Sequence, residues 1–303
     1  EIAIGLCVGV IADGQRASFG YGRLSAGNDQ QPDGATVYEI GSISKVFTGI
    51  LLADAVERKE VQLDQQIQDL LPADVELKIK DQPIRLWHLA THTAGLPRLP
   101  DNRHPADSKN PYADYSEKQL YEFLRKHQPN RSPEETSDYS NLGAGLLGQL
   151  LARRTNMTYG QLLRERITQP LEMTSTAIEL TPQMQQRLAP PHYADGTPSA
   201  NWDIPTLAGA GAIRSTVDDM LSFLAAPIEP PEGTLGKAID LAWQVHWRPK
   251  KVGKFALGLG WHVARDGTTR WHNGGTGGYH SMLLANRELN VAVVVLCNTA
   301  TQE

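Results

Sequence analysis

Two apolar, β-branched segments stand near the two ends of this 303-residue chain. Residues 2–11 (IAIGLCVGVI) lead through turn residues into a weakly alternating stretch over residues 16–22, and this pattern predicts a β-hairpin. After about residue 255 the pattern again predicts strands, separated by glycine, aspartate and asparagine turns. These strands cover residues 256–263, 270–273, 279–286 and 291–297.

Segments with helical periodicity lie between these strands. Gly41 opens a long stretch whose apolar residues recur at helical spacing and which ends in a charged run near residue 60. The helical patterns over residues 61–205 are short and broken by proline and glycine, and the clearest of them covers residues 142–151.

The order of these elements predicts an α/β (α+β) fold. Strands from both chain ends pair most economically in one antiparallel sheet, whose apolar surface helices then cover. We therefore expect residues 1–60 and 206–303 to form a sheet domain, with residues 61–205 inserted as a mostly helical domain.

The composition is that of an ordinary globular protein and narrows the function classes. Hydrophobic residues make up 40% and charged residues 21% of the chain, and the formal net charge is −5. Because the positive residues are scattered, we expect no nucleic-acid partner. The chain has no apolar run of membrane-spanning length and no signal-peptide pattern, so an exported mature protein and a cytosolic protein both stay open.

Cys7 and Cys297, the two cysteines, lie near opposite ends of the chain. They form no C-x-x-C pair and offer no cluster of the kind that binds zinc. We expect two buried thiols in strands. A disulfide between them stays open, because it requires neighbouring strands with suitable geometry.

The pair Ser42-x-x-Lys45 is the first candidate for chemistry, and this spacing occurs once in the chain. Positions three apart share a helix face, so the ammonium can reach the hydroxyl. Serine becomes a useful nucleophile when a base takes its proton, and lysine serves as that base only if its pKa is lowered. Backbone N–H groups at a helix start also stabilise an oxyanion. The alternative is a serine N-cap followed by an exposed lysine.

Tyr139-Ser140-Asn141 is the second candidate and stands just before the apolar helix predicted over residues 142–151. A tyrosine hydroxyl close to a lysine loses its proton more easily and can act as acid and base. The Asn141 amide can hold both the lysine and a substrate amide. Ser108-Lys109-Asn110 and Ser199-Ala200-Asn201 rank below it, because no helix follows either of them.

His272-Asn273-Gly274 is the third candidate, at the end of a short strand and before a glycine-rich turn. A strand beside the nucleophile can pair with an extended substrate, and glycine permits a close approach of the backbones. A rival, Lys251-Val252-Gly253, retains a lysine but has no glycine hairpin behind it.

Two further patterns favour structural roles. Gly143-x-Gly145-x-x-Gly148 matches the dinucleotide fingerprint but begins inside a helix, so we interpret it as close helix packing. His88 and His92 lack the glutamate of the metalloprotease helix, so we expect no zinc there. The G-x-S-x-G nucleophile elbow is absent from the sequence.

The three candidates follow one another in the order S-x-x-K, Y-x-N, H-x-G. In that order they resemble the serine β-lactamase and penicillin-binding-protein superfamily, and within it the class C β-lactamase-like branch with its D-alanyl-D-alanine carboxypeptidase and esterase relatives. The segments Leu89–Pro97 (LATHTAGLP), Gly209–Asp218 and Gly274–Ser281 add to the resemblance, which runs from about Ile4 to Asn298.

The resemblance implies a five-stranded antiparallel sheet with helices on both faces, a mostly helical lobe, and an active site between them. By the same resemblance, Ser42 is acylated, and Lys45 and Tyr139 share the proton transfers. Asn141 orients the lysine and the substrate amide. The family's chemistry implies no metal and no organic cofactor.

The resemblance also implies that His272, Asn273 and Gly274 line the substrate strand. The oxyanion hole is expected at the backbone N–H groups of Ser42 and Gly275. In class C β-lactamases this motif begins with lysine and threonine, so His272 and Asn273 are a departure. A histidine with an ordinary pKa is mostly neutral at pH 7, which predicts weaker binding of a substrate carboxylate, improving at lower pH.

The sequence therefore predicts an active-site serine hydrolase that acts through an acyl-enzyme on small-molecule or peptide substrates, either β-lactams or D-alanyl peptides. A carboxylesterase of the same family is one alternative, and a non-hydrolytic penicillin-binding or sensor protein is another. The family resemblance favours a periplasmic or secreted location. The oligomeric state stays open.

Overall fold

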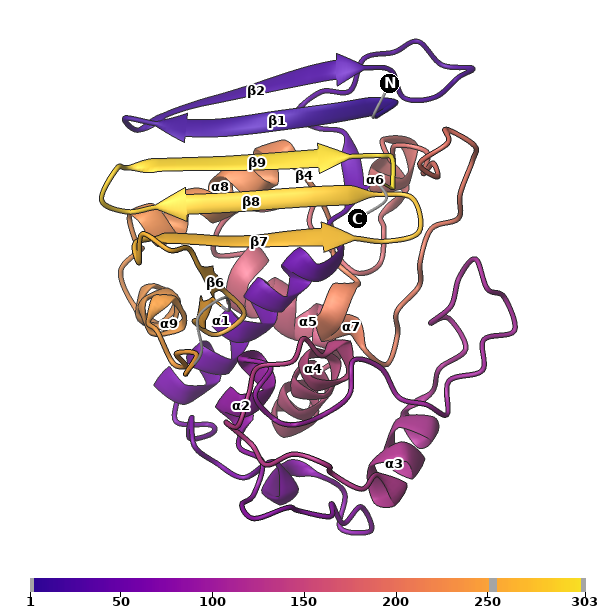
Figure 1. Cartoon of the computed structure of the whole chain (residues 1–303). Coiled ribbons are helices and arrows are strands. Elements are labelled where there is room, and N and C mark those ends of the chain that lie inside the picture. Colours follow the sequence, from indigo (N-terminus) through magenta and orange to yellow (C-terminus); the bar gives the residue numbers. More distant parts are fainter. Residues whose placement is uncertain (1–2, 251–254, 301–303) are drawn as a thin grey trace.

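The computed structural model describes residues 3–250 and 255–300. Within these ranges the two ends of the chain build one antiparallel sheet of seven strands in the order β2-β1-β9-β8-β7-β6-β5 (Figure 1). Its strands are β1 (Gly5–Ala12), β2 (Gln15–Gly22), β5 (Ala256–Leu257), β6 (His262–Val263), β7 (Thr269–Gly275), β8 (His280–Asn286) and β9 (Val291–Cys297).

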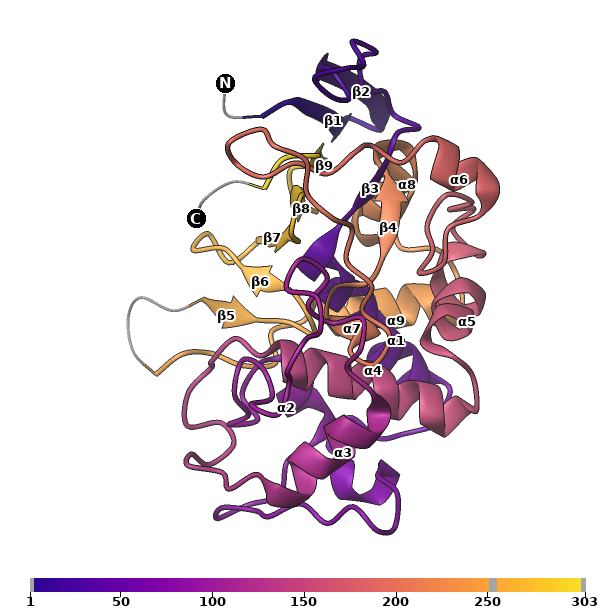
Figure 2. The same cartoon turned by 90° about the vertical axis from the view of Figure 1, so that its right-hand side faces the viewer.

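Helices occupy the middle of the chain and one side of the sheet. Figure 2 shows α1, α8 and α9 together on one side of the strands. The helical elements are η1 (Gly41–Ile43), α1 (Ser44–Glu57), η2 (Ile67–Leu70), α2 (Leu86–Ala90), α3 (Glu117–Lys126), α4 (Asn141–Thr155), α5 (Tyr159–Leu163), η3 (Arg164–Thr168), α6 (Pro182–Gln186), α7 (Ala208–Gly211), α8 (Val217–Ile228) and α9 (Thr234–Trp243). A second, two-stranded sheet pairs β3 (Val37–Glu39) with β4 (Arg214–Thr216).

The central helix α1 is buried on all sides. Every residue from Ser44 to Ala55 is buried, as expected of a helix enclosed by protein rather than lying on its surface. Lys45 lies at its start and Asp54 near its end, so two ionisable side chains are enclosed with it. The start of α1 lies beside β7, which places the Lys45 end of the helix next to the sheet.

Most of the strand predictions are confirmed, and one is wrong. The hairpin of β1 and β2 forms with Ala12 paired to Gln15. The single strand predicted over residues 256–263 is instead a hairpin, in which β5 and β6 pair with each other. The chain reverses at Gly258–Gly260, where Gly258 N donates to Trp261 O and Gly260 adopts a φ of 75°. This reversal adds one strand to the six that the sequence pattern predicts, so the sheet has seven strands in the described residues, whereas the resemblance implies five.

The resemblance implies helices on both faces of the sheet. In the described residues, however, helices cover only one face (Figure 2). No helix within residues 3–250 and 255–300 is both long and apolar enough to cross a bilayer. The division into a sheet domain and an inserted helical domain stays a prediction. The rival motif at residues 251–253 lies outside the described residues.

Cys7 and Cys297 are buried free thiols, as predicted, although β1 and β9 are neighbours. The register explains why they do not pair. Cys297 stands directly opposite Leu6, and Cys7 stands opposite Leu296. Because successive side chains in a strand point to opposite faces, the two thiols lie on different faces of the sheet.

The glycines of α4 serve close packing, as predicted from their helical context. A Cβ on Gly145 would lie 2.6–2.8 Å from Leu207 atoms, including the Leu207 Cα at 2.8 Å. A Cβ on Gly148 would lie 3.1 Å from the Gly209 Cα. The absent side chains therefore let α4 approach α7, whose carbonyls reach the start of α1.

We expect Gly145→Ala to lower the free energy of unfolding by about 1–2 kcal/mol, although alanine favours the helical backbone by about 1 kcal/mol. The added methyl group meets backbone that cannot move aside. Urea denaturation of the variant would measure the change. Gly160→Ala is the matched control, because its Cβ would meet Ile178 at an ordinary 3.6 Å. Equal or greater stability of the Gly145 variant would contradict this account.

Candidate active site

Ser42 lies in a tight turn between β3 and the buried helix α1. Ile43 N donates to Ile40 O and closes a 3-10 turn over Gly41–Ile43. Gly41 adopts a φ of 50°, and a Cβ there would lie 2.7 Å from Gly275 N. Only glycine fits this position without strain, because the turn presses against the end of β7.

Lys45 lies within hydrogen-bonding distance of Ser42, as the spacing predicts. Its Nζ is 2.9 Å from Ser42 Oγ and 2.7 Å from the Ala210 carbonyl oxygen on α7. The side chain is 2% exposed. Burial, with a smaller contribution from the Arg98 charge, lowers the Lys45 pKa well below its usual value. The alternative of an exposed lysine is therefore wrong, and the amine is suited to accept a proton.

Tyr139 brings its ring to this amine from the segment before α4. The ring centroid is 4.8 Å from Lys45 Nζ and 5.2 Å from Arg98 Cζ. The next residue, Ser140, is the N-cap of α4: its Oγ accepts from Gly143 N at 2.8 Å and donates to Pro97 O at 2.7 Å. The helix cap thus determines where the tyrosine lies.

Asn141 begins α4 but does not make the contact with the lysine that the resemblance implies. Its backbone N–H donates to Arg98 O at 3.0 Å. Within the described residues, its side-chain Oδ1 is buried without a hydrogen-bond partner, while Lys45 donates to Ser42 and Ala210. A buried acceptor without a partner costs free energy, so this oxygen is suited to receive a substrate N–H.

His272 is held as a neutral imidazole. It is 1% exposed, and its Nδ1 donates to the Asn273 carbonyl oxygen at 2.5 Å. Its Nε2 is buried and has no partner among the described residues. Burial first, and then His262 and Lys45, lower its pKa well below 6.5. At pH 7 His272 therefore favours the neutral form more strongly than a histidine with an ordinary pKa does.

The end of β7 lies directly against the Ser42 turn. A Cβ on Gly274 would lie 2.1 Å from Ile40 O and 3.0 Å from Ser42 N. Ser281 Oγ, on the neighbouring strand β8, donates to Ile40 O at 2.8 Å. The backbone of Gly274 and Gly275 therefore lies against that of Gly41 and Ser42. That the N–H groups of Ser42 and Gly275 form one oxyanion hole stays a prediction.

Sequence reasoning missed Arg98, and it did not place His92 beside Tyr139. Arg98 follows directly after the segment Leu89–Pro97, and that neighbourhood was the available signal. For His92 the sequence favours a structural role, and the residue lies within the same segment. It has a left-handed φ of 58°, accepts from Ser140 N at 3.2 Å, and places its ring 4.6 Å from Tyr139. It therefore helps to hold the start of α4.

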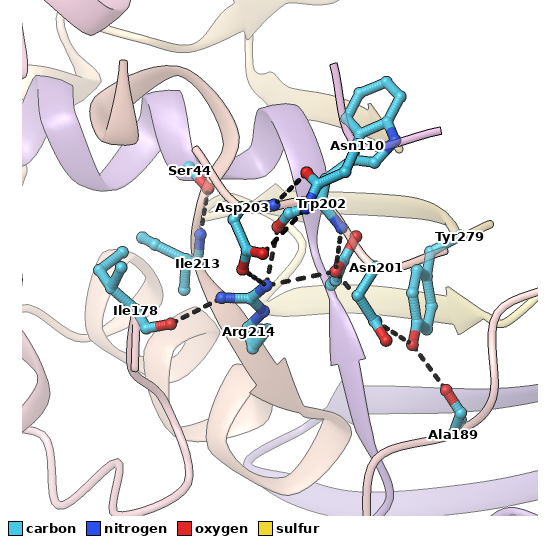
Figure 3. A network of polar contacts seen from close by, with 11 residues as sticks. Ser44, Asn110, Ile178, Ala189, Asn201, Trp202, Asp203, Ile213, Arg214 and Tyr279 are labelled. Carbon is cyan, nitrogen blue, oxygen red and sulfur yellow. Dashed lines mark hydrogen bonds and ion pairs between the residues drawn. The ribbon is translucent and has the colours of Figure 1, made fainter. Parts of the chain in front are cut away.

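The remaining sequence candidates lie in supporting positions. His88 Nδ1 accepts from Arg85 N at 3.0 Å, and its Nε2 is 3.1 Å from Glu134. Asn110 of the first lower-ranked motif donates to Asp203 at 2.9 Å. Asn201 of the second donates to Glu39 and Tyr279, in the polar network that Figure 3 shows.

Comparisons with known proteins identify the family and the fold. A family model described as Beta-lactamase matches residues 2–303. A Beta-lactamase of Escherichia coli (strain K12) is 31% identical over 265 residues, which cover 86% of this chain and 66% of that protein. A D-alanyl-D-alanine-carboxypeptidase/endopeptidase AmpH of the same strain is 28% identical over 312 residues, which cover 97% of this chain and 79% of that protein.

A solved structure shows the same fold. It is described as Beta-lactamase/D-alanine Carboxypeptidase from Yersinia pestis complexed with citrate, and it matches with a TM-score of 0.87 at 26% identity. The match covers 98% of this chain and 88% of that one, which confirms the predicted fold class. The chain spans 66% of the length of the E. coli β-lactamase and 64% of that of a Yersinia enterocolitica β-lactamase.

We expect Arg98→Gln to raise the Lys45 pKa, because it removes a positive charge that disfavours the ammonium. A raised pKa leaves less neutral amine at a given pH. The rise of Ser42 reactivity with pH should therefore move to higher pH, and the shift should shrink in salt because Arg98 is exposed.

The measurement is the rate at which a neutral sulfonyl fluoride labels Ser42, followed by intact mass between pH 5 and 9. Arg103→Gln is the matched control, since Arg103 lies over the Tyr112 ring instead. An unchanged profile in the Arg98 variant, or an equal shift in both variants, would show that Arg98 does not tune the lysine.

Proposed function

We propose that this chain, which belongs to the beta-lactamase family, is a serine hydrolase that forms an acyl-enzyme on Ser42. The observation that carries the proposal is the 2.9 Å contact between Ser42 Oγ and the Lys45 amine, whose pKa burial lowers. A lysine that is neutral at working pH can take the serine proton, which a fully charged one cannot.

Acylation follows from this arrangement. As Ser42 Oγ bonds to the substrate carbonyl carbon, its proton passes to the pair formed by Lys45 and Tyr139. The Lys45 amine lies 4.8 Å from the centroid of the Tyr139 ring. The negative charge that develops on the carbonyl oxygen is stabilised by the backbone N–H groups of Ser42 and Gly275. The same pair then returns the proton to the leaving group as the carbonyl–leaving-group bond breaks.

Deacylation reverses these roles with water as the nucleophile. Lys45 and Tyr139 take a proton from the water, the oxyanion forms again in the same place, and Ser42 leaves as the protonated alcohol. Asn141 Oδ1 accepts the substrate's amide N–H during both half-reactions, which gives this buried oxygen its missing partner. No step requires a metal or an organic cofactor.

β-Lactams and D-alanyl peptides are the substrates we propose, since relatives of this chain carry the names of enzymes for both. Both substrates present an amide carbonyl to the nucleophile and a carboxylate to the β7 side of the site. The neutral His272 offers that carboxylate no fixed charge, so binding should be weak at neutral pH.

A carboxylesterase acting on short acyl esters is the second candidate. The same observation on His272 favours it, because an uncharged ester needs no cation on this side. A periplasmic or secreted location, expected from the resemblance, stays a prediction.

We expect Ser42→Ala to abolish covalent labelling and to lower turnover by a factor of about 10³ or more, since the nucleophile is lost. Wild type and variant would be mixed with a chromogenic cephalosporin, a p-nitrophenyl ester and a D-Ala-D-Ala peptide, and the adducts followed by mass spectrometry. Turnover that survives the substitution would refute the mechanism.

The pattern across substrates then separates the candidate functions. Rapid ester turnover without a β-lactam adduct identifies an esterase. A stable adduct without turnover identifies a non-hydrolytic penicillin-binding protein or sensor.

We expect His272→Lys to lower KM for carboxylate-bearing substrates about tenfold at pH 7, the usual worth of one added charged hydrogen bond. In the wild type, His272 gains its charge only as the pH falls through its lowered pKa, so KM should fall only in acid. The uncharged p-nitrophenyl ester is the matched control substrate. An equal change for both substrates, or no change, would exclude the proposed role of His272.

A further inference from the structure

A buried carboxylate behind the site has no part in the proton transfers. Glu39 ends β3, three residues before Ser42, and is 3% exposed. Its Oε1 accepts from Trp202 N at 2.9 Å and from Asn201 Nδ2 at 3.0 Å, and forms an ion pair with Arg214 at 3.5 Å. A carboxylate is buried at a high cost in free energy, which these partners offset.

The partners of this carboxylate also hold the glycine turn that follows β7. Asn201 Nδ2 donates to Tyr279 Oη at 2.9 Å as well as to the carboxylate. A Cβ on Gly277 would lie 2.5 Å from the Trp202 indole nitrogen, so the backbone of the turn rests on the indole. Figure 3 shows Asn201 joined to Tyr279, with Trp202, Asp203 and Arg214 beside them.

Thr276, in the same turn, also acts on this carboxylate. Glu39 Oε2 and Thr276 Oγ1 are both buried, and within the described residues neither has a partner at hydrogen-bonding distance. Burial has the largest effect on the Glu39 carboxyl and raises its pKa. The Thr276 hydroxyl is among the groups that act against burial and lower this pKa. Thr276 directly follows Gly275, whose N–H group belongs to the proposed oxyanion hole.

On its other side, Glu39 is tied to the nucleophile by the chain itself. Ile40 and Gly41 connect it to Ser42, and Ile40 O accepts from Ser281 of β8. One carboxylate therefore lies between the two segments whose N–H groups must share an oxyanion. Displacing either N–H group by a fraction of an ångström would weaken the stabilisation of that charge.

We infer that Glu39 is a positioning residue for the oxyanion hole: it holds the Gly275–Tyr279 turn at a fixed distance from the Ser42 turn. The inference rests on the proposed acyl-enzyme function. Glu39 touches neither substrate nor nucleophile and acts through Asn201, Trp202 and the turn. Its loss should therefore reduce stabilisation of the tetrahedral state and leave ground-state binding almost unchanged.

The test compares Glu39→Gln with Asp203→Asn. Glutamine keeps the size and one acceptor for Trp202 N but removes the charge that faces Arg214. Asp203 is the other acidic partner of Arg214, at 3.2 Å, and its side chain is 64% exposed. The control thus removes one acidic partner of the same arginine and leaves the contacts to the glycine turn in place. Asn201→Ala is a second variant, which breaks the link to Tyr279 and keeps the carboxylate.

For Glu39→Gln and Asn201→Ala we expect the acylation rate constant to fall about 10–100-fold, a part of what loss of one oxyanion donor costs. Affinity for a boronic acid, which forms a tetrahedral adduct on serine, should fall by the same factor. KM should stay within about twofold, and Asp203→Asn should behave as wild type. If Glu39→Gln does not fold, Asn201→Ala alone carries the test.

Two outcomes overturn the inference. One is that Glu39→Gln and Asn201→Ala match Asp203→Asn in both measurements. The other is that they lower only the melting temperature, with kinetics unchanged well below it, which would mark a purely structural role. Failure of the proposed function looks different, because the wild type itself would then form no Ser42 adduct.

Discussion

The burial of the Lys45 amine beside Ser42 is the interaction on which the rest of the structure depends. The amine donates to a hydroxyl and to the Ala210 carbonyl, neither of which carries a negative charge. An ammonium enclosed in this way is disfavoured relative to the neutral amine, and the proposed role of Lys45 as a base requires that neutral form. The stability of the surrounding helices has to offset that cost, and the enclosed helix α1 supplies the setting.

The sheet and the helices bring three distant segments to this amine. The turn at Ser42, the segment at Tyr139 and the strand end at Gly274 meet for two reasons. Strand β8 holds β7 in register, and the glycines of α4 let this helix pack closely on α7. Glycine contacts at both junctions set the spacing. The geometry of the site is therefore a consequence of backbone packing rather than of long side chains reaching inward.

The same enclosure determines the charges around the site. Burial lowers the pKa of Lys45, and it also lowers the pKa values of His272 and His92, which favours their neutral forms. Nearby positive charges lower these pKa values further. Arg98 is the exposed cation at the edge of this group. The result is a site rich in basic residue types that carries little fixed charge inside, which suits proton transfer better than anion binding.

The sequence by itself determined the local features: the β1–β2 hairpin, the helix after Gly41, and the spacing that puts Ser42 and Lys45 on one face. These depend on periodicity and on neighbours in the chain. The order of three short motifs added the fold class, because that order belongs to a known family.

Tertiary structure decided what depends on contacts between distant segments. It split the predicted strand 256–263 into a hairpin, because Gly260 N bonds to the Ala90 carbonyl of another element. It left Asn141 without its expected lysine partner, and joined Glu39 through Asn201 to Tyr279 of the glycine turn. Burial and hydrogen-bond geometry belong to the folded chain, and so do the lowered pKa values of the residues that would carry the chemistry.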